Sequence, residues 1–132
     1  MFTTKTEYGL RALVKLAKNK NHKPISLAQI AKEEQLPQPY LEQIFSKLKA
    51  NDIVTSVKGS EGGYILSRPA SEINLFEIIE ALEGPLVIFY CLAQDNLNNG
   101  CNIKNCLTKK VWNEIQINII KILRKSKLSH LI

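Results

Sequence analysis

Long hydrophobic runs are absent from this chain of 132 residues. The longest apolar run, Pro85 to Ala93, is far shorter than the roughly 20 apolar residues that a transmembrane helix needs. Residues 1–16 carry charges throughout and lack the uninterrupted apolar core of a secretory signal peptide. We therefore expect a cytoplasmic protein that does not associate with a membrane.

Motifs for catalysis are also missing. The two histidines, His22 and His130, lie in no recognisable pattern, so we expect them to face solvent or to pack. Gly59, Gly62 and Gly63 do not open a helix and are no nucleotide fingerprint. No nucleophile with a nearby base is evident. The sequence predicts that the chain is not an enzyme and has no catalytic residues.

Cysteine is scarce, and its spacing limits its role. The three residues Cys91, Cys101 and Cys106 are too few for a disulfide framework in a cytoplasmic chain, which leaves metal binding or redox chemistry. Close C-x-x-C pairs are lacking, so a structural zinc site is less favoured. On a flexible Asn- and Gly-rich connection, three thiolates can converge on one centre, as in iron–sulfur proteins. The alternative is three reduced thiols, with Cys91 in the core.

The composition and charge of the chain suit a nucleic-acid-binding domain. Apolar residues make up 45% and charged residues 23%, as in ordinary globular proteins. The net charge of +6 is uneven: residues 1–70 hold 11 Lys and Arg against 6 Asp and Glu, whereas residues 71–132 hold 7 against 6. The amino-terminal half therefore carries nearly all of the positive excess that a polyanion-binding face requires.

Two short helices and a turn predict a helix-turn-helix unit. Ser26 can cap the first helix, and Pro37 separates it from a second one. Apolar residues recur at helical spacing in the second helix, at Leu41, Ile44, Phe45 and Leu48. Its other face carries residue types that reach base edges and phosphates, namely Gln38, Glu42, Gln43 and Lys47.

A β-hairpin is predicted directly after this unit. Ile53, Val54 and Val57 are followed by a glycine-rich turn that starts at Lys58, and an extended run resumes at Tyr64. Glycines let such a tip approach a phosphate closely, and Lys58 adds positive charge, so the segment suits the wing of a winged helix. The alternative is a plain surface hairpin beside a helical pair that binds nothing.

Three further helices complete the predicted fold, which is mainly α with a small β-hairpin: a winged helix-turn-helix plus a long C-terminal dimerisation helix. The first is capped by Thr3 or Thr4 and runs to about Asn19, and a short one over residues 75–84 stops at Gly84 and Pro85. A loop over 94–105 leads to the last helix, Leu107 to Lys125. Its apolar surface is too broad for one small domain to cover, which favours a homodimer; the alternative is an entirely intramolecular use.

The blocks TKTEYGLRALVKLA, PYLEQ, KGSEGGY and ALEGPL occur together, and with them the chain resembles the Rrf-type winged-helix transcription factors of bacteria, the IscR, NsrR and CymR type. The match covers essentially the entire chain. The resemblance implies a DNA-binding domain over 1–70, a short helix and cysteine-bearing sensor loop over 71–106, and a dimerisation helix and tail over 107–132. It implies a homodimer on palindromic double-stranded DNA.

The resemblance also assigns residues to DNA. Glu42 and Gln43, with the position of Pro39, would read bases; a glutamate can accept from cytosine and a glutamine can pair with adenine, whereas the proline side chain cannot donate a hydrogen bond. The expected phosphate contacts are Thr3, Lys5, Gln38, Tyr40, Lys47, Lys58 and Ser60.

Many members of this family hold an iron–sulfur cluster, which would place Cys91, Cys101 and Cys106 as ligands, with 2Fe–2S favoured over 4Fe–4S. The spacing departs from the best-known pattern, and no histidine follows Cys106. The fourth ligand would then be water or Glu7 from the partner subunit, although Glu7 and Arg11 also suit an ordinary surface pair. The expected function is DNA binding controlled by redox, nitric oxide or iron status. The alternative is a cluster-free regulator controlled by a partner enzyme or a metabolite of sulfur metabolism.

Overall fold

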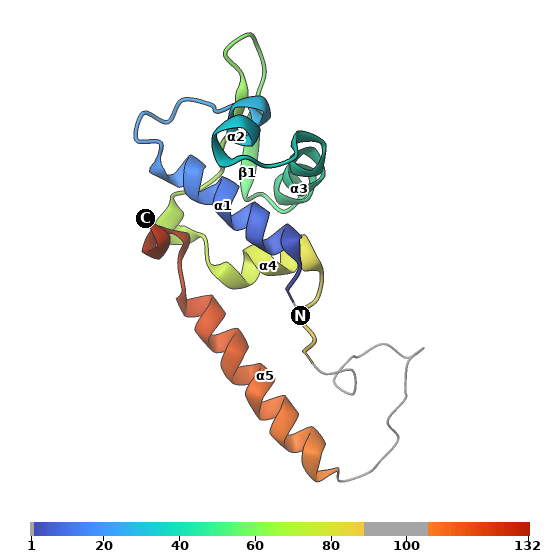
Figure 1. The fold of residues 1–132 in the computed structure, drawn as a ribbon. Helices are drawn as coiled ribbons and strands as arrows, with labels where there is room; N and C mark the ends of the chain where they lie inside the picture. Colours follow the sequence, from blue (N-terminus) through green and yellow to red (C-terminus); the bar gives the residue numbers. More distant parts are fainter. Residues whose placement is uncertain (1, 89–105) are drawn as a thin grey trace.

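The computed structural model describes residues 2–88 and 106–132. The fold is mainly helical with one two-stranded antiparallel hairpin, as predicted (Figure 1). The elements follow the order α1 (Thr4–Lys18), α2 (Leu27–Glu34), α3 (Gln38–Ala50), β1 (Val54–Val57), β2 (Gly63–Leu66), η1 (Ala70–Glu72), α4 (Leu75–Glu83), α5 (Leu107–Lys125) and η3 (Leu128–Leu131).

Helix α1 is the central element of the body. Its cap is Thr3, whose Oγ1 accepts a hydrogen bond from the Lys5 N–H at 3.2 Å. The helix contacts α2, α3, α4, β2 and η3, and it buries Ala12, Leu13 and Leu16. The predicted bounds are confirmed to within a residue at each end.

Helices α2 and α3 form the predicted helix-turn-helix. Ser26 caps α2 by accepting from the Gln29 N–H at 3.1 Å, and Gln35 ends it in the left-handed region, with φ of 55°. Pro37 then precedes α3. Proline has no backbone N–H, and the start of a helix tolerates this because the first N–H groups have no partner within the helix. The predicted apolar stripe of α3 is fully buried: Leu41, Ile44, Phe45 and Leu48.

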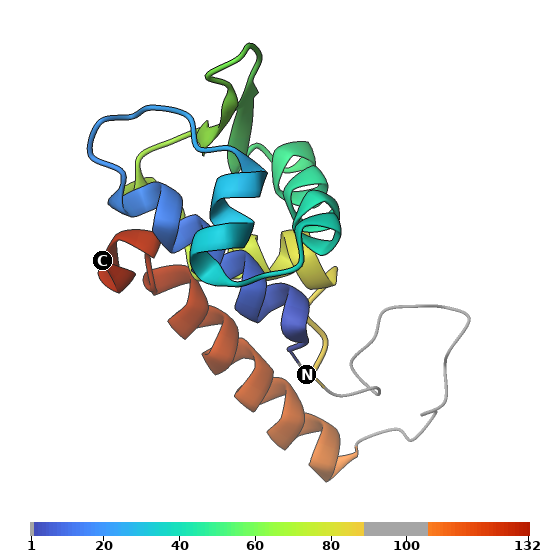
Figure 2. The same ribbon diagram turned by 45° about the horizontal axis from the view of Figure 1, so that its top comes forward.

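The hairpin packs on α3. Strands β1 and β2 pair with Val54 opposite Leu66, and an isolated antiparallel bridge joins Ile25 to Tyr64 of β2. The rings of Phe45 and Tyr64 meet edge to face with centroids 4.9 Å apart. The base of the hairpin is therefore fixed, while its tip projects from the body (Figure 2).

A glycine at position 63 is expected to be required for the bridge between Ile25 and Tyr64. Its φ is 157°, and a Cβ there would lie 2.3 Å from the Ile25 carbonyl oxygen, so Gly63→Ala must break the Ile25–Tyr64 bridge. We expect a loss of about 1–3 kcal/mol in the free energy of unfolding, measured by urea denaturation. Gly59→Ala is the matched control, because φ is 118° there but nothing lies within 4 Å. Equal losses in the two variants would contradict the steric argument.

Helix α4 joins the same hydrophobic core as the winged helix. Asn74 caps it by accepting from the Glu77 N–H at 2.9 Å, and Gly84 ends it with φ of 85°. Ile78 and Leu82 of α4 and Leu128 of η3 belong to the core cluster that contains Leu13 and Phe45. The end of the chain therefore folds back onto the amino-terminal body.

Helix α5 has the predicted bounds and diverges from the body toward its amino-terminal end (Figures 1 and 2). Near its other end, the Arg124 guanidinium lies over the Phe76 ring of α4, 4.4 Å from the centroid. None of its residues is buried. Exposed apolar residues at helical spacing form what we call the α5 stripe: Leu107, Val111, Ile115 and Ile122. Among the residues that the structure describes, no helix is long and apolar enough to cross a membrane.

Candidate nucleic-acid interface and cysteine segment

The exposed face of α3 carries the predicted base-reading residues. Pro39, Glu42 and Gln43 are all exposed, on the side opposite the buried stripe. Gln38 and Lys47 are exposed on the same helix. The helix therefore presents hydrogen-bonding side chains outward from a backbone that its core contacts hold rigidly.

Tyr40 links the start of α3 to the start of α1. Its ring is half-buried and meets Tyr8 edge to face at 5.7 Å, and its hydroxyl lies 3.2 Å from the Thr4 Oγ1. Two of the segments predicted to hold phosphates are thus neighbours in space.

Thr3 and Lys5 lie at this start of α1, but Thr3 already has a partner in the DNA-free chain. Its N–H and its hydroxyl donate to Glu83 Oε1 at 2.8 and 2.6 Å. A phosphate contact through this hydroxyl would have to replace the contact with Glu83. The last residue of α4 therefore fixes the position of Thr3 at the start of α1.

Lys47 also contacts the end of α4. Its Nζ donates to the Leu82 carbonyl oxygen at 3.4 Å. Although the side chain as a whole is exposed, desolvation of its ammonium group, and next the nearby Lys5, lower the pKa of Lys47. The two lysines gather positive charge where α1, α3 and α4 meet.

Lys58 and Ser60 are exposed at the tip of the hairpin. The tip is closed by a hydrogen bond from the Gly62 N–H to the Gly59 carbonyl oxygen at 3.0 Å. It stands apart from the starts of α1 and α3 (Figure 2). The predicted phosphate contacts therefore fall into two groups, one at the junction of α1 with α3 and one on the projecting tip.

Sequence reasoning assigned no role to Glu83. Its contact with Thr3 joins residues 80 positions apart, which no local pattern reveals. The one signal was its place in the block ALEGPL.

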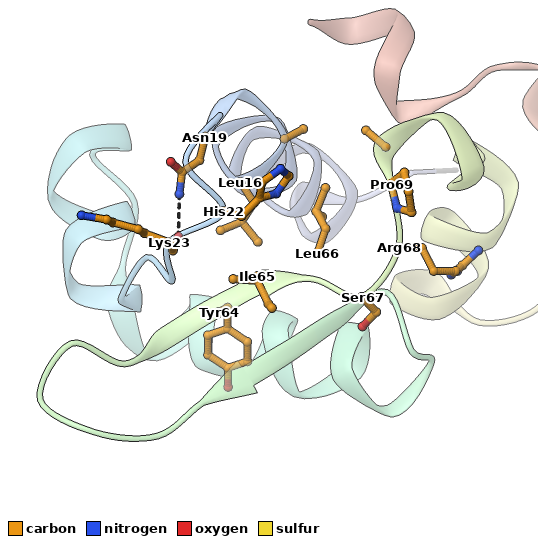
Figure 3. Close-up of a pocket in the computed structure, with 12 residues that line it drawn as sticks. Leu16, Asn19, His22, Lys23, Tyr64, Ile65, Leu66, Ser67, Arg68 and Pro69 are labelled. Atoms are coloured by element: carbon orange, nitrogen blue, oxygen red, sulfur yellow. Dashed lines mark hydrogen bonds between the residues drawn. The ribbon is translucent and has the colours of Figure 1, made fainter.

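A pocket of about 390 Å³ lies between β2 and the end of α1. Leu16, Ile65 and Leu66 form apolar walls beside His22, whereas the side chains of Lys23 and Arg68 point away from it (Figure 3). These two cations are therefore not placed to orient a ligand inside the pocket. His22 and His130 are both exposed, as expected.

Cys106 is the one predicted cysteine ligand within the described residues; Cys91, Cys101 and the predicted loop 94–105 lie outside them. Cys106 is a free, partly exposed thiol at the N-cap of α5. Its Sγ lies 2.9 Å from the Thr108 Oγ1, and hydrogen bonds from the Thr108 hydroxyl and then the Lys109 N–H lower the pKa of this thiol. The thiolate is the form that ligates metals, so Cys106 fits the donor chemistry of a cluster. In the described parts of the chain, no group of three His, Cys, Asp or Glu side chains is placed to hold a metal ion.

Glu7 is exposed in the first turn of α1. The ordinary surface pair with Arg11 is not formed, because the Arg11 Nη2 donates to the Glu34 carbonyl oxygen at 2.5 Å and lies 3.7 Å from the Glu34 Oε2. Within residues 2–88 and 106–132, the Glu7 carboxylate has no hydrogen-bond or ion-pair partner. Its oxygens are therefore free to bind a metal ion or to accept a hydrogen bond from another molecule.

Comparison with known proteins places these features in a family. The Rrf2 family, described as an iron-dependent transcriptional regulator, matches residues 2–132. The chain is 32% identical over 130 residues to the HTH-type transcriptional regulator IscR of Photorhabdus laumondii, covering 98% of this chain and 77% of the relative. Among solved structures it is similar to CymR, the global cysteine regulator of B. subtilis, with a TM-score of 0.82 and 30% identity over 99% of this chain and 95% of that one. It is also similar to T. potens IscR, with a TM-score of 0.79 and 32% identity over 99% and 85%.

These relatives are transcriptional regulators, which confirms the expectation that the chain is not an enzyme. Their likeness extends over the winged helix, α4 and α5 together. The chain belongs to the Rrf2 family of DNA-binding transcriptional regulators.

Proposed function

We propose that this chain acts as a homodimer that binds a palindromic operator and changes its affinity with an iron–sulfur cluster held by Cys91, Cys101 and Cys106. In this proposal residues 1–70 bind DNA, residues 71–106 sense and residues 107–132 dimerise, in the cytoplasm. The observation that carries it is the exposed polar face of α3, flanked by the cations Lys5 and Lys47 and by the projecting hairpin tip.

Base reading and phosphate binding are divided between different side chains. With α3 in the major groove, Glu42 accepts from a cytosine amino group and Gln43 pairs with adenine, while Pro39 contributes shape only. The cations Lys5, Lys47 and Lys58 neutralise phosphates. The list of expected phosphate contacts is completed by the polar residues Thr3, Gln38, Tyr40 and Ser60.

Lys58→Ala and Gln43→Ala are expected to separate these two roles. Lys58→Ala should weaken binding to every duplex and lower the slope of affinity against salt by about one, because one phosphate contact is lost. Gln43→Ala should cost about 1–3 kcal/mol of discrimination at one base pair and leave binding to random duplex unchanged. Fluorescence anisotropy on a duplex selected in vitro with this protein, and on random duplex, measures both. Equal losses on the two duplexes in both variants would refute the division.

The proposed cluster is supported by three features. The family is described as iron-dependent, the hydrogen bond with Thr108 lowers the pKa of the Cys106 thiol, and Glu7 has a carboxylate without a partner in the described chain. When bound, a cluster supplies redox and nitric oxide chemistry, with 2Fe–2S the favoured type. Glu7 of the partner subunit is the candidate fourth ligand.

The place in the chain of the cysteine segment, residues 84–106, suits a coupling role. It joins α4, whose last turn contacts Thr3 and Lys47, to α5, which carries the α5 stripe. A change in this segment could therefore alter both the contacts of α4 with Thr3 and Lys47 and the proposed dimer contact through the α5 stripe.

A cluster-free regulator is the second candidate, favoured by the likeness to CymR, the global cysteine regulator of B. subtilis. Such a protein would have the same DNA-binding half and would respond to a partner enzyme or a sulfur metabolite. An anaerobic preparation that is colourless and free of iron, yet binds its operator, would favour this candidate.

A further inference from the structure

One oxygen atom of Glu83 collects three donors from the first turn of α1. Glu83 Oε1 accepts from the Thr3 N–H at 2.8 Å, the Thr3 hydroxyl at 2.6 Å and the Thr6 hydroxyl at 2.8 Å. Thr6 is buried and Glu83 is half-buried. Desolvation alone would raise the pKa of Glu83, but these hydrogen bonds, together with the Lys5 charge, lower it. The carboxylate is therefore a fixed negative anchor for the start of α1.

The same turn of α4 also contacts α3. The Leu82 carbonyl oxygen, one residue before Glu83, accepts from the Lys47 Nζ. Glu83 attracts the charges of both Lys5 and Lys47, and these two lysines repel each other. Without this acceptor oxygen, the start of α1 would lose three hydrogen bonds and, with them, its attachment to the end of α4.

We propose that Glu83 is a positioning residue for DNA binding: its carboxylate holds Thr3 and Lys5 at the start of α1 beside Lys47 of α3, so that the phosphate-binding junction is ordered before DNA arrives. The inference rests on the proposed function, in which Lys5 and Lys47 neutralise phosphates; a phosphate contact through the Thr3 hydroxyl would replace its contact with Glu83. Its physical basis is that a pre-ordered surface loses less conformational freedom on binding.

Substitutions at Glu83 separate anchoring from charge. Glu83→Gln keeps an acceptor oxygen for Thr3 and Thr6 but removes the negative charge, so it should bind random duplex at least as tightly as the wild type, with an undiminished salt slope. Glu83→Ala makes the same change in charge but removes the acceptor, so it should bind the selected duplex about tenfold more weakly. Glu80→Ala is the matched control, because Glu80 is an exposed carboxylate on the same helix.

A second variant tests the same anchor from the other side. Thr6→Val is close to isosteric and removes one donor to Glu83 without touching a residue proposed to contact DNA. It should weaken binding in the wild type and have no further effect in Glu83→Ala, a non-additivity that marks a shared interaction. Thermal unfolding of each variant shows whether the protein measured is folded.

The outcomes are distinct. Binding by Glu83→Ala equal to that of Glu80→Ala, equal losses in Glu83→Gln and Glu83→Ala, or additive effects of Thr6→Val and Glu83→Ala would each overturn the inference. Lys58→Ala and Gln43→Ala, measured in the same assay, test the proposed function independently. If they lose binding while Glu83→Ala does not, only the role of Glu83 fails.

Discussion

Ile115→Glu combined with Ile122→Glu is expected to convert the protein to a monomer and to weaken operator binding by about 10² to 10⁴-fold, because two linked heads bind a palindrome with avidity that one head lacks. The two side chains are 37% and 63% exposed in the single chain, at helical spacing with Val111. A second copy would bury this stripe by two-fold symmetry, and buried glutamates without partners would prevent that contact.

The control for this prediction is Asn113→Glu, which adds a glutamate to an exposed position of the same helix on the opposite side from the α5 stripe. It should leave both mass and affinity unchanged. Sedimentation equilibrium and anisotropy on the selected duplex give the two readouts. A double variant that stays dimeric would refute the α5 stripe as the dimer contact, and a monomer with unchanged affinity would refute the avidity argument.

Wild-type protein purified without oxygen is expected to be coloured, and Cys106→Ser is expected to abolish the colour together with the response of operator binding to oxidant. The serine hydroxyl does not ionise at neutral pH and is a poor ligand for iron, so one lost thiolate should suffice. Cys91→Ser and Cys101→Ser should behave alike. Absorption spectra with iron and acid-labile sulfide counts provide the measurement.

Glu7→Gln tests the fourth ligand in the same preparation. It should retain iron but shift the spectrum or speed cluster loss, whereas Glu80→Gln, an exposed carboxylate on α4, should match the wild type. Colourless wild-type protein whose operator affinity ignores oxidant, nitric oxide and chelator would exclude the cluster and leave the cysteine-regulator alternative.

Much of the fold was predictable because its signals are local. The cap residues Thr3, Ser26 and Asn74 mark helix starts through bonds to N–H groups two or three residues later. Gly84 marks the end of α4 because it adopts a positive φ. The buried stripe of α3 follows from helical spacing alone, and it decides which residues remain outside for DNA.

The candidate site was only partly predictable. The exposed face of α3 was expected, but the partners of the residues around it were not. Arg11 pairs with Glu34 rather than with Glu7, and Thr3 donates to Glu83. Both contacts cross between elements, and the packing of α1 against α2 and α4 selects them.

The sequence by itself determined the helix-turn-helix, the hairpin and the long last helix, because caps, turns and apolar spacing act within a few residues. Only the tertiary structure decided that Glu83 gathers the start of α1 and that the α5 stripe stays uncovered by the described chain. These properties depend on which surfaces pack together in the folded core. Residues 80 positions apart in the sequence carry no local pattern that predicts such a contact.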